Sequence, residues 1–270
     1  MILEPHTLLF AFGMTMIAGL STGIGSLIAL IAKRTNTKFL CASLGFSAGV
    51  MLYVSFMEII PEAKDELSHF FGNEKTGTLS LLLAFFGGMA LITLIDLLVP
   101  NMNNPHEPHG VEEMGKKPSD KSLHRAGLFV ALALSIHNFP EGIAVFSSAL
   151  YDHSVAIPIT IAIAIHNIPE GIAVSVPIYH ATGNRRKAFW ISFMSGLTEP
   201  LGALIAYLFL MSFWTPVING IMLAAVSGIM VYISLDELLP AAEKYGEHHV
   251  SITGLIVGMV IMAVSLFLFI

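Results

Sequence analysis

Charged residues are scarce in this chain of 270 residues, where they make up 12% of the total against 55% for hydrophobic residues. Two stretches, 5–32 and 200–235, contain no Asp, Glu, Lys or Arg at all. A soluble domain has about 25% charged residues, whereas about 20 apolar residues in succession suffice to cross the hydrocarbon core of a bilayer. The lack of charge therefore excludes a soluble enzyme and predicts several membrane spans.

Cysteine is nearly missing too, because Cys41 stands alone and an intrachain disulfide is thereby excluded. No Lys or Arg precedes the first apolar stretch, which is also longer than a signal-peptide core, so we expect it to remain as a membrane helix. The net charge of −6 predicts no nucleic-acid partner. The sequence at 110–117 resembles a P-loop but lacks its Ser or Thr and its preceding strand, so no nucleotide partner is expected.

Eight helices account for the apolar stretches when these are divided at charges, prolines and glycines. Their expected limits are 7–32, 39–60, 77–99, 123–149, 154–179, 187–211, 215–239 and 250–270. The segment 100–122 is polar and is expected to be a flexible loop. The sequence thus predicts an all-α polytopic membrane protein in which residues 1–270 form one transmembrane domain in the lipid bilayer.

Basic residues are distributed unevenly over the predicted loops. If the first helix starts outside, the inner side holds 11 of the 13 basic residues, and only Lys64 and Lys75 fall outside. The inner ones are Lys33, Arg34, Lys38, Lys116, Lys117, Lys121, Arg125, Arg185, Arg186, Lys187 and Lys244. Because Lys and Arg are enriched in cytoplasmic loops, both termini are expected outside and the loop 100–122 is expected in the cytoplasm.

Two parts of the chain repeat with an odd shift in helix number. Positions of the second helix recur in the seventh at an offset of 179, and the first and sixth helices match at an offset of 177, which brings Thr22 opposite Glu199. A shift of five helices reverses the direction through the membrane. We therefore expect an inverted repeat of helices 1–3 and 6–8 around central helices 4 and 5, an arrangement in which transporters bind substrate where the repeats meet.

The two central helices share the motif His-Asn-x-Pro-Glu-Gly-Ile-Ala-Val, at positions 29 residues apart. Its His and Glu are spaced i,i+4 and therefore lie on one helix face, with the Asn beside them. The Pro has no N–H and leaves a carbonyl without its helical donor. The candidate ligands are His137, Asn138 and Glu141 in the fourth helix and His166, Asn167 and Glu170 in the fifth.

Carboxylates inside predicted spans are costly, since an ionised group near the bilayer centre costs about 3 kcal/mol or more. Glu141, Glu170 and Glu199 have no Lys or Arg deep in any span, so they must be protonated, hydrated or bound to a cation. Imidazole with Glu and Asn oxygen favours Zn²⁺, Fe²⁺, Mn²⁺, Co²⁺ or Ni²⁺ over Mg²⁺, Ca²⁺ or Cu⁺. Two facing motifs offer ligands for two ions, with Glu141 and Glu170 as bridges.

Other polar residues near the span ends leave alternatives open. Glu58 is either a deep ligand or an interfacial charge on the outer side, and Asp236 and Glu237 are either exit-path groups or interfacial charges on the inner side. His106 and His109 in the inner loop either capture metal or are simply solvated. The remaining histidines are expected at the membrane interface.

The doubled motif, the Ser-Gly-x-x-Glu-Pro sequence at 195–200 and the Glu-x-x-Pro sequence at 58–61 resemble the ZIP family of divalent-metal transporters, in particular its bacterial ZupT-like branch. The resemblance spans all eight predicted helices. It implies inward transport of Zn²⁺, often with Fe²⁺, Mn²⁺ or Co²⁺, and it implies a homodimer in a membrane for which the bacterial inner membrane is expected. The implied metal ligands are His137, Asn138, Glu141, His166, Asn167, Glu170 and Glu199, with Glu58 contributed by the second helix.

Two other function classes compete with a metal carrier. A membrane di-metal enzyme would use Glu-x-x-His pairs and a zinc protease His-Glu-x-x-His, whereas this motif reads His-x-x-x-Glu with an internal Pro. No resident cofactor and no enzyme activity are therefore expected. A metal-selective channel remains an alternative, although the inverted repeat favours alternating access.

Overall fold

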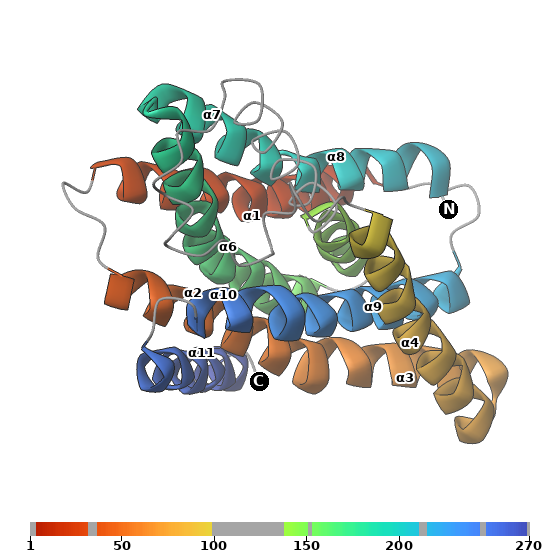
Figure 1. Cartoon of the computed structure of the whole chain (residues 1–270). Coiled ribbons are helices and arrows are strands. Elements are labelled where there is room, and N and C mark those ends of the chain that lie inside the picture. The colour runs from red at the N-terminus through yellow and green to blue at the C-terminus, as the bar shows by residue number, and fades with distance from the viewer. Residues whose placement is uncertain are drawn as a thin grey trace.

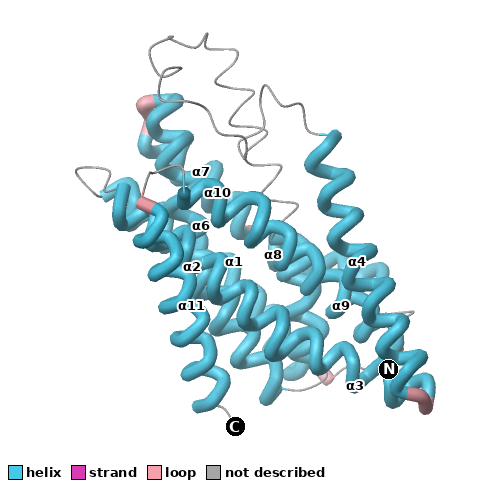
Figure 2. Tube along the Cα trace, turned by 60° about the horizontal axis from the view of Figure 1, so that its bottom comes forward, coloured by secondary structure: helices cyan, strands magenta, loops and turns pink. Residues whose placement is uncertain are grey.

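Helices form every regular element in the part of the chain that the computed structural model describes, namely residues 4–31, 37–98, 138–150, 153–210, 215–243 and 247–268. They lie side by side in one bundle (Figure 1, Figure 2). The helices are α1 (Pro5–Ile31), α2 (Thr37–Val54), α3 (Ile60–Phe71), α4 (Glu74–Leu98), the segment 138–150, α6 (His153–Thr182), α7 (Arg185–Gly196), α8 (Thr198–Ile205), α9 (Pro216–Ile233), α10 (Leu239–Glu243) and α11 (His248–Leu268). Three π-helical turns accompany them: η1 (Ser55–Ile59), η4 (Ala206–Leu210) and η6 (Ser234–Leu238).

Six helical stretches within the described residues are long and apolar enough to cross a membrane, so an integral membrane protein is confirmed. They are Pro5–Ile28, Cys41–Phe71, Glu74–Leu97, Arg185–Phe209, Pro216–Glu243 and His248–Leu268. Helix α6 is long enough, but its polar residues limit the apolar part to Ala156–Ile172. The helix predicted over 123–149 is described only from residue 138, so the count of eight stays a prediction.

Helices α4 and α11 lie at the periphery of the bundle (Figure 1) and turn large apolar side chains outward. Leu83 on α4 is 68% exposed, and Val260 on α11 is 54% exposed. Such side chains are at home in hydrocarbon, because the bilayer removes the cost of exposing them to water. These two helices therefore form part of the lipid-facing surface of the bundle.

Two long helices continue through a π-turn, which joins α2 to α3 and α9 to α10. The N–H of Ile60 bonds to the carbonyl of Ser55, and a matching bond joins Leu239 to Ser234. A proline follows each turn and cannot donate to the preceding turn. The helices expected over 39–60 and 215–239 consequently run on to residues 71 and 243 rather than ending near their prolines.

The sixth predicted helix, 187–211, is divided at Leu197 into α7 and α8. Pro200 has no N–H, so the carbonyl of Gly196 cannot be bonded in the usual way, and an α-helix is interrupted there. The interruption places Glu199 in the first turn of α8.

Glycines let the helices that carry the shared motif approach their neighbours. A Cβ at Gly171 on α6 would overlap the carbonyl oxygen of Thr22 on α1, and a Cβ at Gly142 in the segment 138–150 would overlap the carbonyl oxygen of Glu199. Both glycines directly follow the motif glutamate, so close packing is built in beside the candidate ligands. Backbone-to-backbone contact of this kind is how small residues tighten helix packing in membranes.

Candidate metal centre

Three ligand-bearing side chains meet in the interior of the bundle. One potential ligand atom from each of Glu141, His166 and Glu170 lies within 4.8 Å of the other two. The three residues are 1%, 0% and 3% exposed. Glu141 comes from the segment 138–150, and the other two lie one helical turn apart on α6. The structure thus brings the two copies of the motif face to face.

His166 is oriented by its own helix. Its Nδ1 lies 3.1 Å from the carbonyl oxygen of Ala162. Because a carbonyl can only accept, this contact assigns the proton to Nδ1 and leaves the Nε2 lone pair directed away from α6. Nε2 lies 3.3 Å from Oε1 of Glu141. Two ligand atoms bound to one tetrahedral Zn²⁺ at 2.0–2.2 Å are about this far apart.

Serine supports the same part of α6 from a neighbouring helix. The Oγ of Ser47 on α2 donates to the backbone carbonyl of His166 at 3.3 Å. That carbonyl would otherwise serve the residue four positions on, which donates normally only when it is not proline. The hydroxyl is buried and ties α2 to the helix that carries the candidate ligands.

Glu199 joins the centre through an amide. Asn167 Nδ2 donates to Oε1 of Glu199 at 2.5 Å and to the carbonyl of Ala18 on α1 at 3.0 Å. Both side chains are 0% exposed. Asn167 Oδ1 and Glu199 Oε2 are buried without a hydrogen-bond partner. Acceptor oxygens in this state are costly unless a proton or a cation reaches them.

Asn138 completes the set of buried polar side chains from the two motifs. Its Nδ2 donates to the carbonyl of Ser195 on α7 at 3.4 Å, and the residue is fully buried. The segments 138–150 and 153–182, which carry most of the candidate ligands, contain no Lys or Arg. The charge-balancing group for the buried carboxylates is therefore not supplied by either helix.

The remaining predicted ligands do not join the cluster of three. His137, His106 and His109 lie outside the described residues. Glu58 lies in η1 and is half-buried. Glu237 lies in η6 and is also half-buried. The last two stand at matching positions of the two π-turns, which spacing alone did not indicate.

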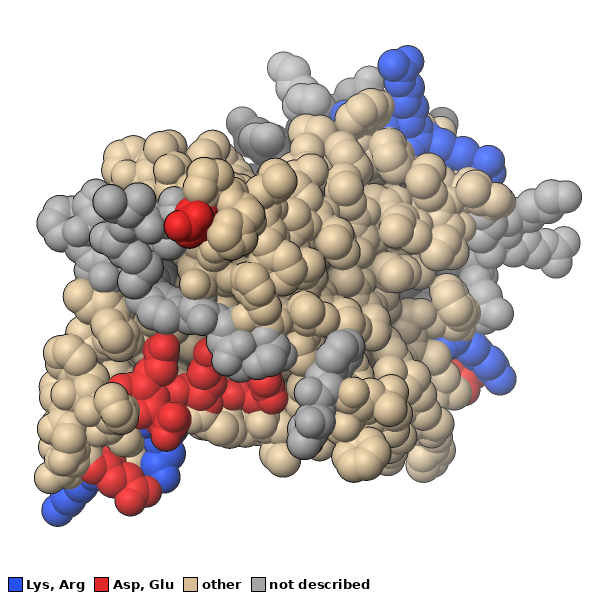
Figure 3. Space-filling model, turned by 180° about the vertical axis from the view of Figure 1, so that it is seen from behind, with Lys and Arg blue, Asp and Glu red and all other residues tan. Residues whose placement is uncertain are grey.

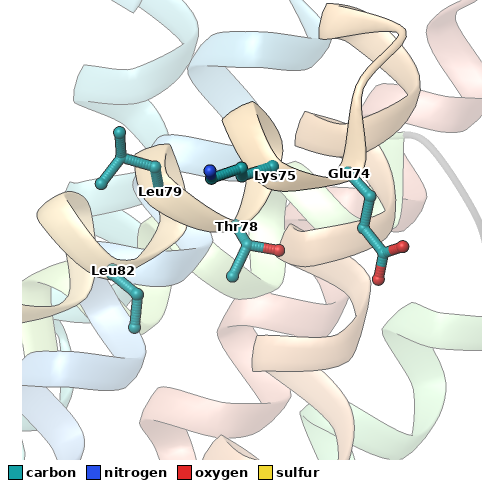
Figure 4. Close-up of a pocket in the computed structure, with 5 residues that line it drawn as sticks. All are labelled: Glu74, Lys75, Thr78, Leu79 and Leu82. Carbon is teal, nitrogen blue, oxygen red and sulfur yellow. The ribbon is translucent and has the colours of Figure 1, made fainter.

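The surface hollows of the molecule lie away from this centre. One, of about 490 Å³, is lined by Glu74, Lys75, Thr78, Leu79 and Leu82, all on α4 (Figure 4). Another, of about 510 Å³, runs between α2 and α11 and is mostly apolar. Neither includes a candidate ligand. The cluster of Glu141, His166 and Glu170 is therefore enclosed rather than open to either face.

Comparison with known proteins agrees with this chemistry. A family model described as ZIP Zinc transporter matches residues 6–124 and 100–266. A protein named zinc transporter ZupT from Streptococcus mutans is 60% identical over 260 residues, which cover 96% of this chain and 97% of that protein. Proteins of the same name from Clostridium perfringens and Nitratidesulfovibrio vulgaris are 57% and 54% identical over 279 residues, covering 98% and 99% of each chain. Because the matches run over nearly the whole length of both partners, this chain belongs to the family of ZIP zinc transporters.

Proposed function

We propose that this protein carries Zn²⁺ across the membrane into the cytoplasm, with Fe²⁺, Mn²⁺ and Co²⁺ as further substrates. The observation that carries the proposal is the buried cluster of Glu141, His166 and Glu170. Borderline-soft divalent ions favour nitrogen and carboxylate oxygen together. The relatives named zinc transporter support Zn²⁺ as the first substrate to test.

The contact between His166 and Glu141 supports a cation in this cluster. With its proton on Nδ1, a neutral His166 presents a lone pair to the Glu141 carboxylate at 3.3 Å. Two acceptors at this distance repel each other unless a proton or a metal ion lies between them. A divalent ion relieves the repulsion and also supplies the positive charge that the two helices lack.

A second ion would use the amide side of the centre. Glu141 and Glu170 would bridge the two ions, and Asn138, Asn167 and Glu199 would offer oxygens to the second one. His137 precedes Asn138 and would complete the set from the fourth helix. Glu58 is proposed as a group that the ion meets on its way in rather than as a member of the cluster.

An inverted repeat is part of the proposal, and three features support it. The π-turns Ser55–Ile59 and Ser234–Leu238 coincide at the offset of 179 found in the sequence. Gly49 of α2 packs on α11, whereas its counterpart Gly228 of α9 packs on α4, as an exchange of the two halves requires. Gly19 of α1 and its counterpart Gly196 of α7 pack on each other's carbonyls. We infer eight spans in all, with the fourth beginning before residue 138.

Transport in this scheme is alternating access. The ion enters from outside, exchanges water for the buried ligands, and leaves inward when one group of helices shifts against the other. The enclosed cluster favours a carrier over an open pore, because no hollow lined by its residues connects it with the surface. Protonation of the ligands on the inner side would aid release, since metal binding requires deprotonated ligands.

The proposed setting follows from the charge asymmetry and the family. Both termini lie outside, the segment 100–122 lies in the cytoplasm, and the membrane is the bacterial inner membrane. A homodimer is proposed as the working form, and the outward apolar faces of α4 and α11 offer surface for it. No enzymatic reaction is part of the proposal.

The experiment is metal uptake into proteoliposomes by the wild type, by Glu170→Ala, and by Glu170→Ala combined with His166→Ala. We expect saturable uptake of Zn²⁺ that is lost in both variants, with Mg²⁺ not transported. Glu243→Gln, on α10 and away from the cluster, is the control and should transport normally. Unchanged flux in the double variant would refute the proposed site, and uptake that does not saturate would favour a channel.

A further inference from the structure

An acidic face of the second long helix is not used by the metal centre. Glu58, Glu62 and Glu66 follow one another at i,i+4 spacing and are half-buried. Steps of three or four residues connect them to Ser47, whose hydroxyl bonds to the His166 carbonyl. Residues at such spacing lie on one helix face, so the acidic face continues the face that contacts α6. Acidic side chains gather in one patch on the side of the molecule where α3 lies (Figure 3).

A fully buried amide lies against the far end of this face. Asn219 of α9 is 0% exposed, and its Nδ2 donates to Oε2 of Glu66 at 2.8 Å. Its Oδ1 has no hydrogen-bond partner. The helices are closely packed here, since a Cβ at Gly220 would lie 2.8 Å from the Leu67 side chain. A buried carbonyl oxygen without a partner costs about 1–3 kcal/mol, which gives this amide a reason to meet a cation.

The nearby lysine is not available to neutralise Glu66. Lys64 Nζ lies 2.8 Å from Oε1 of Glu74, and this pair is exposed at the start of α4. The orientation of the Asn219 amide is an assignment, because its oxygen and nitrogen differ little in scattering or shape. Rotated by 180°, it would direct Oδ1 toward the carboxylate of Glu66. That arrangement is favourable when a cation lies between the two oxygens.

We propose that Glu62, Glu66 and Asn219 form an outer cation station that binds a divalent ion through oxygen atoms only. Glu62 is one helical turn from Glu66 on the same face. Oxygen donors without imidazole suit Mn²⁺, Mg²⁺ or Ca²⁺ and bind Zn²⁺ less tightly than the central cluster does. Its role in capture rests on the proposed function and orientation. Held there, ions are concentrated at the start of the acidic face that leads to α6.

Binding of Mn²⁺ to the purified full-length protein tests the station directly. Counting free Mn²⁺ by electron paramagnetic resonance, we expect a tight and a weak class of site in the wild type. Glu66→Gln and Asn219→Leu should each lose the weak class, and Glu170→Gln should lose the tight one. Glu74→Gln removes the same charge on the same side and should keep both. A weak class that survives in Glu66→Gln overturns the station, whereas a tight class that survives in Glu170→Gln overturns the proposed centre alone.

Asn219→Asp separates a ligand from a merely structural hydrogen bond. It removes the donor to Glu66 but adds a carboxylate oxygen. A station predicts that Mn²⁺ raises the melting temperature of this variant more than that of the wild type. A structural contact predicts loss of stability that Mn²⁺ does not restore, and that result would count against the proposal.

Uptake at different salt concentrations tests the role in capture. At about 20 mM salt we expect kcat/KM for Zn²⁺ to fall about 3- to 10-fold in Glu66→Gln with kcat unchanged, because attraction to an acidic surface acts on capture. At about 0.5 M salt, where charges are screened within a few Å, the difference from the wild type should largely vanish. A loss that appears in kcat, or that Glu74→Gln reproduces, contradicts the capture role.

Discussion

Replacement of Asn167 by Leu should weaken metal binding without dismantling the helix. The amide bonds to Glu199 and to the Ala18 carbonyl, and it offers Oδ1 to the centre. Leu has a similar volume but makes none of these contacts. A hydrogen bond to a charged group contributes about 1.5–3 kcal/mol, and this range corresponds to about 10- to 150-fold in Kd. We expect the Kd for Zn²⁺ to rise by that factor, because Glu199 is no longer oriented.

The measurement is a competition titration of the purified protein against a chromophoric Zn²⁺ chelator. Thr160→Val is the matched control, since it removes a buried hydrogen bond to the Ala156 carbonyl on the same helix, at 2.7 Å, without touching the centre. It should lose some stability and keep the wild-type Kd. If folded Asn167→Leu binds Zn²⁺ within about twofold of the wild type, the assignment of Asn167 as the residue that orients Glu199 is wrong.

Three further predictions concern packing, protons and linkage. Gly171→Ala should abolish folding or lower the melting temperature strongly because its Cβ overlaps the Thr22 carbonyl, whereas Gly13→Ala, with nothing within 4 Å, should be silent; thermal melts in detergent compare them. Zn²⁺ affinity should fall as pH is lowered from about 7 to 5, since protons compete for the ligands, and a calorimetric titration at constant salt checks the sign; affinity that does not change with pH would contradict binding by imidazole and carboxylate. Zn²⁺ at about 100 times its Kd should stabilise the wild type by about 2.7 kcal/mol but leave Glu170→Gln unaffected in the same melts.

Local spacing was enough to predict the ligands of the central motif. The i,i+4 relation of histidine and glutamate is a property of any α-helix, so Glu141, His166 and Glu170 could be chosen without a tertiary structure. The pairing of Asn219 with Glu66 could not, because the two residues are far apart in sequence and neither belongs to a motif. A polar residue inside an apolar span was the only signal, and it did not name a partner.

Helix limits were predicted where composition changes and missed where backbone geometry intervenes. The helices around Pro61 and Pro240 were expected to end near those residues, yet each continues after a π-turn. A π-turn adds one residue to a helical turn and has no side-chain signature. The break before Glu199 has the same character, since Pro200 is compatible with a helix start as well as with an interruption.

The sequence by itself determined that this is a membrane protein and which residue types could hold a metal ion, because uncharged runs and helical spacing are local properties. It also determined the family, since the matching residues extend over nearly the whole chain. Only the tertiary structure decided that Glu141 from one helix meets His166 and Glu170 from another, and that Asn167 connects Glu199 to α1. Those contacts depend on how closely helices cross, and glycine contacts between distant backbones set that distance.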